Sequence, residues 1–186
     1  MSAFDTYITD LDGTLCNTLE ANIAAYGLAF ADAGLKFDES AYRDNFGHRF
    51  DEMMQAIAPA ATTEQRLFIA DRKARHYKKQ ASLVLINEHL VDVLRHAKSN
   101  SIKVGLATTA KRRNALAVLQ YFGLEELFDV MIFGEDVTHS KPHPECYQLA
   151  IQHLGAQPSN VLIFEDSLVG LEAARNSGAH VLKIAI

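Results

Sequence analysis

The sequence predicts an α/β fold built on a parallel sheet. Short apolar segments of strand length recur along the chain, and amphipathic helical patterns lie between the later ones. Polar residues follow directly after several of these segments. Strands that alternate with helices form βαβ units, so we expect a parallel sheet with helices on both of its faces.

Five segments are expected to form the strands of this sheet. They are rich in aliphatic and β-branched residues and cover residues 5–9, 102–107, 130–133, 161–164 and 180–184. Helical spacing of apolar residues predicts helices over 114–122, 144–154 and 168–177. Gly178 follows the last of these helices, at a position where glycine commonly ends a helix.

Residues 18–85 interrupt the alternation of strands and helices. This stretch shows helical patterns over 19–33, 50–58 and 64–79 and no convincing strand. Turn residues separate these patterns. We therefore expect a catalytic core formed by residues 1–17 and 86–186, with a helical cap domain formed by residues 18–85.

Composition excludes several classes of protein. Hydrophobic residues make up 48% of the 186 residues and charged residues 22%, which is typical of a globular protein with a buried core. The formal net charge of −5 argues against a nucleic-acid partner. No apolar run approaches membrane-helix length and no secretory signal is visible, so we expect a cytoplasmic protein without a membrane partner, a monomer or weak dimer.

Polar residues follow four of the expected strands. In open α/β sheets, ligands bind beyond the carboxyl ends of the strands, so these residues are expected to meet at one rim. They are Asp10 and Asp12 after the first strand, Thr108 and Thr109 after the second, Lys141 after the third, and Glu165 and Asp166 after the fourth.

This set of residues suits phosphoryl transfer to a carboxylate. Several acids around one point repel each other unless a hard cation such as Mg²⁺ joins them. Lys141, the Thr108 hydroxyl and the amides of a following helix can bind a phosphate dianion. Asp10 can then act as the nucleophile, and Asp12 as the general acid and later the general base.

Four motifs resemble those of the haloacid dehalogenase-like hydrolases, in the subgroup with a helical cap after the first motif. Their order and spacing match over nearly the whole chain. They are Asp10-Leu11-Asp12-Gly13-Thr14-Leu15, then Thr108, then Lys141 in Ser140-Lys141-Pro142, and then Glu165-Asp166-Ser167 with Gly170. The resemblance implies a Rossmann-like sheet of strand order 5-4-1-2-3.

The resemblance also implies a role for each residue at the rim. Asp10 is the expected nucleophile and a ligand of Mg²⁺, and Asp12 is the acid and base and binds the metal through its backbone carbonyl. Asp166 is a further metal ligand, and Glu165 acts on the metal directly or through a water. Thr108 is expected to bind the phosphoryl group, and Lys141 to neutralise it. Because Asp12 is present, phosphate-ester chemistry is expected rather than dehalogenation.

Residues of the expected cap resemble elements that select the substrate in capped members of this family. His48 and Arg49 lie in a segment similar to the specificity loop, and Lys73 lies in a pattern seen in β-phosphoglucomutase and related phosphatases. With Thr109, these residues are the expected substrate-binding set. The leading hypothesis is a Mg²⁺-dependent phosphatase that acts on a small phosphorylated metabolite through an aspartyl-phosphate.

Three alternatives remain at this point. A sugar phosphomutase of the β-phosphoglucomutase type would use the same residues. A metabolite-binding relative without activity is a second possibility. A signalling receiver domain also forms an aspartyl-phosphate, but its phosphorylated aspartate follows the third strand and it has no helical insertion. The eight histidines form no evident metal cluster, and we interpret His139 and His143 as part of the turn around Lys141.

Overall fold

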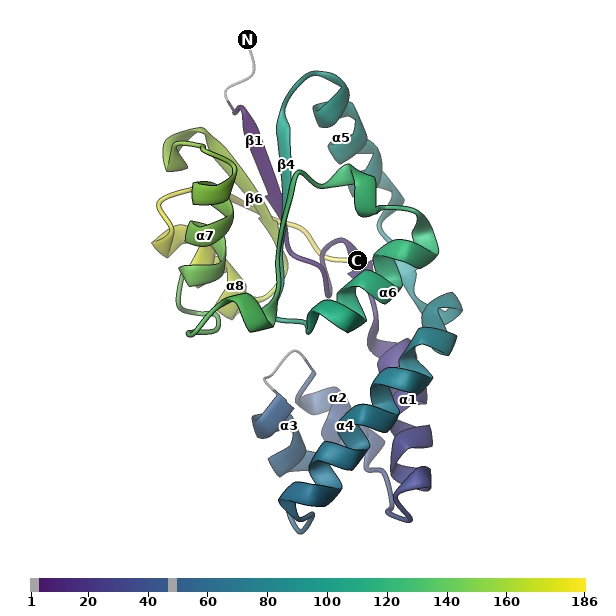
Figure 1. Ribbon diagram of the computed structural model, residues 1–186. Coiled ribbons are helices and arrows are strands. Elements are labelled where there is room, and N and C mark those ends of the chain that lie inside the picture. The colour runs from purple at the N-terminus through teal and green to yellow at the C-terminus, as the bar shows by residue number, and fades with distance from the viewer. Residues whose placement is uncertain (1–3, 47–49) are drawn as a thin grey trace. The chain divides into compact units, whose positions relative to one another are not determined.

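The computed structural model describes residues 4–46 and 50–186, and the chain divides into two compact units (Figure 1). The first unit contains the described chain up to Asn17 together with residues 86–186, and the second contains the described residues of 18–85. Short strands β2 (Cys16–Asn17) and β3 (Leu85–Ile86) pair with each other where the chain passes between the units. Among the described residues, no helix is long and apolar enough to cross a bilayer.

A five-stranded sheet forms the centre of the first unit, and all neighbouring strands run parallel. Its strands lie in the order β7-β6-β1-β4-β5. Numbered within this sheet alone, that is the expected order 5-4-1-2-3, and the labels differ because β2 and β3, which were not expected, are counted as well. The strands agree with the expected segments to within one residue: β1 (Thr6–Thr9), β4 (Lys103–Ala107), β5 (Val130–Ile132), β6 (Val161–Glu165) and β7 (His180–Lys183).

Helices cover both faces of this sheet, which confirms the α/β fold. In Figure 1, α7 (Glu145–His153) and α8 (Leu168–Asn176) lie on one face, and α5 (Glu88–Ser99) and α6 (Arg112–Phe122) lie on the other. A core of buried side chains, which includes Ile8 of β1 and Ile163 of β6, fills the space under α7 and α8. Alternate residues of a strand point to the same face, so these side chains pack together across neighbouring strands.

Helix α5 was not among the expected helices, although its pattern was sufficient to predict it. Its buried residues Leu90, Val91, Leu94 and Ala97 recur at the spacing of one helix face. Asn87 caps its first turn, because its Oδ1 accepts a hydrogen bond of 3.1 Å from the Leu90 amide. Short 3-10 helices complete the chain: η1 (Lys78–Leu83), η2 (Glu125–Leu127), η3 (Gly134–Asp136) and η4 (Pro158–Asn160).

The second unit is helical, as expected. Its helices are α1 (Leu19–Asp32), α2 (Glu39–Asp44), α3 (Phe50–Ile57) and α4 (Thr63–Tyr77), of which α2 was not expected. Helices α1 and α4 pack against each other around a core that contains Phe30, Met54 and Ile69. A capping box between Thr62 and Gln65 fixes the start of α4.

Helix α8 approaches the end of β6 closely at Gly170. A Cβ atom at this position would overlap the carboxylate of Glu165. Glu165 is only 1% exposed and accepts hydrogen bonds from the amides of Asp166 and Ser167 at 2.9 and 3.0 Å. Glycine at position 170 therefore leaves the space in which this buried carboxylate is held.

We expect Gly170→Ala to lower the free energy of unfolding by about 1–3 kcal/mol, because the added methyl group must displace a fixed, buried carboxylate. Gly27→Ala is the matched control, since Gly27 also lies in a helix and its Cβ would be 3.9 Å from the nearest atom, Cδ1 of Phe37. This change should stabilise the protein by up to about 1 kcal/mol, the usual helix preference for alanine. Urea unfolding measures both, and a neutral Gly170→Ala would show that Glu165 moves aside freely.

Candidate active site

Residues from separate strands meet at the carboxyl end of the sheet. Thr9, the last residue of β1, pairs with Leu106 of β4 and with Phe164 of β6. The residues that follow these three strands therefore lie next to each other at the same edge of the sheet. The Asp10 amide donates a hydrogen bond of 3.0 Å to the carbonyl of Phe164, which fixes Asp10 beside the end of β6.

Lys141 joins two of the carboxylates at this rim. Its Nζ lies 2.5 Å from Oδ1 of Asp10 and 2.8 Å from Oε2 of Glu165. The side chains are 5%, 8% and 1% exposed for Lys141, Asp10 and Glu165, so all three charges are almost completely removed from water. The loop after β5 thus brings Lys141 to the ends of β1 and β6.

Burial and mutual charge shift the pKa values of these groups in different directions. Burial raises the pKa of Asp10 well above its usual range, and Glu165 and Asp12 add to this rise while Lys141 opposes it. Burial alone would lower the pKa of Lys141, but the charge of Asp10 and further anionic neighbours outweigh it and raise this pKa. Lys141 is therefore a permanent cation that favours the ionised form of Asp10.

Glu165 is held by more partners than any sequence motif suggests. Its Oε1 accepts bonds from the Asp166 and Ser167 amides and from the Ser167 hydroxyl, and its Oε2 accepts from Lys141 and from Tyr147 at 2.7 Å. Burial would raise the pKa of Glu165, but Lys141 and these bonds lower it. Both of its oxygens are engaged, which makes it less suited to a direct metal bond than Asp10 or Asp166.

Tyr147 is a residue of this site that the sequence analysis missed. It lies in α7, is fully buried, and donates its hydroxyl hydrogen to Glu165. Its ring centroid lies 4.7 Å from Nζ of Lys141, a distance typical of a cation–π contact. Its position six residues after Lys141, in the apolar pattern of a helix, reads from sequence as an ordinary core residue.

The turn after β1 brings Asp166 close to the first motif. The hydroxyl of Thr14 donates a hydrogen bond of 2.8 Å to Oδ1 of Asp166. Gly13 has a φ of +95°, and a Cβ at this position would overlap the Asp166 carboxylate. Asp12 precedes this glycine in the turn and is half-buried. The glycine is thus required both by the backbone conformation and by the neighbouring acid.

Asp10, Glu165 and Asp166 each offer a carboxylate oxygen within 4.8 Å of the others, a spacing at which one cation can contact several of them. Burial raises the pKa of Asp166, the Thr14 hydrogen bond opposes this rise and Glu165 adds to it. A divalent cation would relieve the repulsion that raises the pKa values of Asp10 and Asp166. The oxygen donors fit a hard cation such as Mg²⁺.

Thr108 follows β4 and is 1% exposed. Its Oγ1 accepts a hydrogen bond of 3.0 Å from the Ala110 amide, so the hydroxyl stabilises the turn that leads into α6. Thr109, by contrast, is exposed. The loop after β5 packs tightly against this turn, because a Cβ on Gly134 would overlap the carbonyl oxygen of Thr109.

Of the three substrate-binding residues expected in the second unit, the structure describes one, Lys73. Lys73 lies in α4 and is 6% exposed, with its Nζ 4.0 Å from the centroid of the Tyr77 ring and 5.4 Å from that of Tyr26. Its ammonium group therefore lies among aromatic rings of its own unit. His48 and Arg49 lie outside the described residues.

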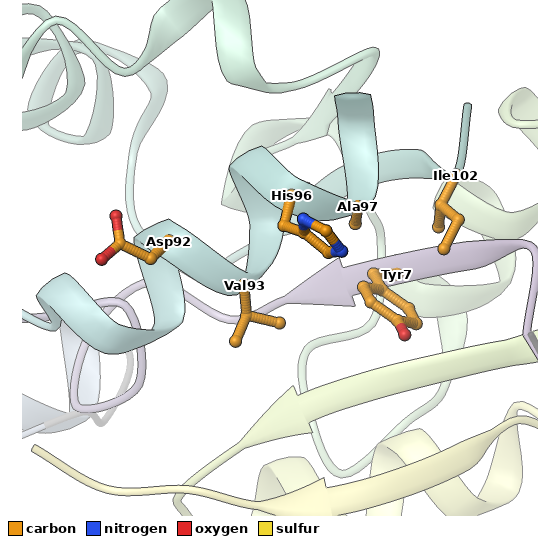
Figure 2. A pocket seen from close by; sticks show the side chains of 6 residues that line it. All are labelled: Tyr7, Asp92, Val93, His96, Ala97 and Ile102. Atoms are coloured by element: carbon orange, nitrogen blue, oxygen red, sulfur yellow. The ribbon is translucent and has the colours of Figure 1, made fainter. Parts of the chain in front are cut away.

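A separate hollow of about 320 Å³ lies beside β1 and α5 (Figure 2). Figure 2 shows Tyr7 of β1 opposite a row of side chains from α5, among them Val93 and His96. Its lining is mostly apolar and contains none of the acids, hydroxyls or the lysine described above. The chemistry of the protein is therefore assigned to the rim and not to this hollow.

Comparison with known proteins agrees with this geometry. Residues 7–184 match the family of haloacid dehalogenase-like hydrolases. The chain is 33% identical, over 94% of its length and 82% of the other, to the phosphorylated carbohydrates phosphatase of Thermotoga maritima. It is 28% identical, over 97% of its length and 83% of the other, to the pyrophosphatase PpaX of Oceanobacillus iheyensis.

The fold is also similar to that of a solved structure, CbbY of Rhodobacter sphaeroides in complex with phosphate. The two superpose with a TM-score of 0.87 at 27% identity, over 98% of this chain and 87% of that one. The family match covers nearly the whole chain, including the acids of the rim and Lys141. The chain therefore belongs to the haloacid dehalogenase-like hydrolases and is an enzyme of the phosphatase class.

Proposed function

We propose that this protein is a Mg²⁺-dependent phosphatase that hydrolyses a small phosphorylated metabolite through phosphorylation of Asp10. The observation that carries the proposal is the buried pair of Lys141 and Asp10, with Asp166 beside it at the carboxyl end of the sheet. A carboxylate that is shielded from water and paired with a cation, which favours its ionised form, is suited to act as a nucleophile.

In the first step, a carboxylate oxygen of Asp10 attacks the phosphorus atom of the substrate. The bond between phosphorus and the ester oxygen breaks, and its electron pair stays with the leaving oxygen. Asp12 is placed two residues after the nucleophile, in the same turn, and is proposed to donate a proton to that oxygen. The products are the alcohol and a phosphorylated Asp10.

In the second step, Asp12 removes a proton from a water molecule, whose oxygen attacks the phosphorus atom of phosphorylated Asp10. The bond between phosphorus and the Asp10 oxygen breaks, which releases inorganic phosphate and restores the carboxylate. Lys141 contacts Asp10 and is proposed to neutralise charge on the phosphoryl group in both steps. Thr108 is proposed to bind a phosphoryl oxygen, which its hydroxyl can do while it accepts from Ala110.

Asp10, Asp166 and the backbone carbonyl of Asp12 are the proposed ligands of Mg²⁺. When bound there, the ion supplies positive charge to the carboxylates and to the phosphoryl oxygens. Glu165 is proposed to act on the ion only through a water, because its own oxygens already accept hydrogen bonds from Lys141, Tyr147 and the start of α8. Its direct task is to hold Lys141 in place.

The substrate is proposed to be a small phosphorylated molecule, with phosphorylated carbohydrates as the first class to test. The support is the 33% identical relative from Thermotoga maritima, whose name gives this class. Residues 18–85 are proposed to act as a cap that selects the alcohol part of the substrate. Lys73, His48 and Arg49 of this cap, and Thr109 of the catalytic core, are the proposed contacts of the substrate. Lys73 must then act from its place over the Tyr77 ring.

We expect Asp10→Asn to reduce phosphate release by roughly 10³-fold or more, because the amide removes the nucleophile with little change in shape. Asp5→Asn is the matched control, since Asp5 is an exposed aspartate at the opposite end of the same strand. Phosphate release from a panel of sugar phosphates and other phosphorylated metabolites measures both variants.

Activity that survives in Asp10→Asn would contradict the mechanism. Interconversion of sugar phosphates with little release of phosphate would instead identify a phosphomutase. Folded protein that binds Mg²⁺ but acts on no member of the panel would favour a binding protein.

Removal of divalent cations with EDTA should abolish activity, and added Mg²⁺ should restore it. Mg²⁺ at 100 times its Kd should also stabilise the native protein by about 2.7 kcal/mol, because it binds only the folded state. Asp166→Asn should weaken both the recovery of activity by Mg²⁺ and the stabilisation by Mg²⁺. The asparagine keeps an oxygen that can accept the hydrogen bond from Thr14. Thermal unfolding at increasing Mg²⁺ concentrations tests this without an assay of activity, and equal shifts in Asp166→Asn and Asp5→Asn would rule out Asp166 as a ligand.

Tyr147→Phe should lower the free energy of unfolding by about 1–3 kcal/mol, because Oε2 of the buried Glu165 loses one of its two donors. We also expect it to lower kcat more than it changes KM, because Lys141 is then held less firmly at the nucleophile. Tyr121→Phe is the control, as Tyr121 is 57% exposed. Urea unfolding and steady-state kinetics measure the two variants, and identical behaviour of the pair would show that the Tyr147 hydroxyl has no such role.

A further inference from the structure

The loop between η3 and α7 carries two exposed histidines on either side of the buried Lys141. The side chains of His139 and His143 are 64% and 50% exposed, and their ring centroids lie 4.7 Å apart. Lys141 contacts Asp10 and is almost completely buried. The loop therefore turns one side chain into the site at the rim and two imidazoles toward solvent.

Glu145, the first residue of α7, fixes the position of these rings. Its Oε1 accepts a hydrogen bond of 2.8 Å from the Thr138 amide, and its Oε2 accepts from the His139 amide at 2.8 Å. These backbone bonds, together with the His139 ring, lower the pKa of Glu145 to about 2, so its carboxylate is ionised at neutral pH. The carboxylate is thus held in one place by the main chain of the loop.

Both imidazole rings turn a nitrogen toward Oε2 of Glu145. Nδ1 of His139 lies 2.9 Å from this oxygen and Nδ1 of His143 lies 3.9 Å from it. The Glu145 amide donates a long bond of 3.3 Å to Nδ1 of His143, so the neutral ring presents an unprotonated nitrogen there.

We propose that His139, His143 and Glu145 form a binding site for a transition-metal dication such as Zn²⁺. One ligand atom from each residue lies within 4.8 Å of the other two. Zinc bonds of about 2.0–2.2 Å to nitrogen and oxygen place tetrahedral ligand atoms about 3.3 Å apart. The exposed imidazole rings can rotate to bring the ligand atoms from their present separations to this spacing. Water can supply the fourth ligand.

The chemistry of the ligands separates this site from the acids at the rim. Imidazole nitrogen favours Zn²⁺, Ni²⁺ and Cu²⁺, whereas the all-oxygen set of Asp10 and Asp166 suits Mg²⁺. His139 can bind a metal through Nδ1 once its hydrogen occupies Nε2, a change of tautomer that needs no net loss of a proton. Binding of Zn²⁺ at this site does not depend on the proposed phosphatase mechanism.

The test is a Zn²⁺ titration of the untagged protein in excess Mg²⁺, read by competition with a chromophoric chelator. Wild-type protein should bind one equivalent. We expect Kd to rise about 10-fold or more in His139→Ala and in His143→Ala, and about 100-fold in the double variant. His153→Ala is the matched control and should leave Kd unchanged, because His153 is an exposed histidine at the far end of α7, the helix that begins at Glu145.

Replacement of Zn²⁺ by Co²⁺ provides a second readout, because tetrahedral coordination gives visible absorption that should be lost in the double variant. The proposal is overturned if the double variant binds Zn²⁺ as tightly as wild-type protein, or if His153→Ala weakens binding equally. It is also overturned if Asp10→Asn abolishes the binding, since the ion would then occupy the rim. Circular dichroism should show unchanged folding in the histidine variants, because the replaced imidazole side chains are exposed.

Discussion

The buried contact of Lys141 with Asp10 and Glu165 is the constraint on which the rest of the structure depends. Three charged groups lie almost out of contact with water, and such groups are tolerated only when they are paired and hydrogen-bonded. Loss of one partner from a buried pair typically costs about 3–5 kcal/mol, because an uncompensated charge remains. The ends of β1 and β6 and the loop after β5 must therefore meet in one arrangement, and this arrangement also positions Asp10, the proposed nucleophile.

The three neighbouring acids of the rim differ in what surrounds them. Glu165 accepts hydrogen bonds at both oxygens, and its pKa is lowered. Asp10 is buried and Asp166 is half-buried, both lie beside other negative charges, and their pKa values are raised. The same functional group is thus placed in different environments: one carboxylate is fixed by hydrogen bonds, and two are the proposed ligands of a cation.

Much of this arrangement can be predicted from sequence because each motif directly follows a strand that is recognisable from its own residues. The strands are short apolar runs, and each motif follows one of them, so parallel pairing alone brings Asp10, Thr108 and Asp166 to one edge. Helix α5 could also have been predicted, since Leu90 and Leu94 repeat on one face. The contact of Tyr147 with Glu165 could not, because a tyrosine in an apolar helix pattern reads as core.

Two other features of the structure also depend on contacts that the pattern of residue types does not show. The need for glycine at position 170 depends on how closely α8 approaches Glu165 at the end of β6, which the sequence does not show. His139 and His143 have the spacing of three intervening residues that occurs among zinc ligands, but this spacing alone does not show that Glu145 lies beside both rings. Their convergence depends on how the main chain of the loop bonds to Glu145, which no pattern of residue types reveals.

The insertion of residues 18–85 after β1 has a consequence for the order of folding. Thr6 of β1 pairs with Lys103 on one side and with Val161 on the other, so the central strand finds its partners only from the later half of the chain. The helical unit, in which α1 and α4 pack against each other, is encoded in full before either of these partner strands. During synthesis the helices can assemble first, and the first strand, with the proposed nucleophile Asp10 after it, pairs only when the later strands of the sheet have been made.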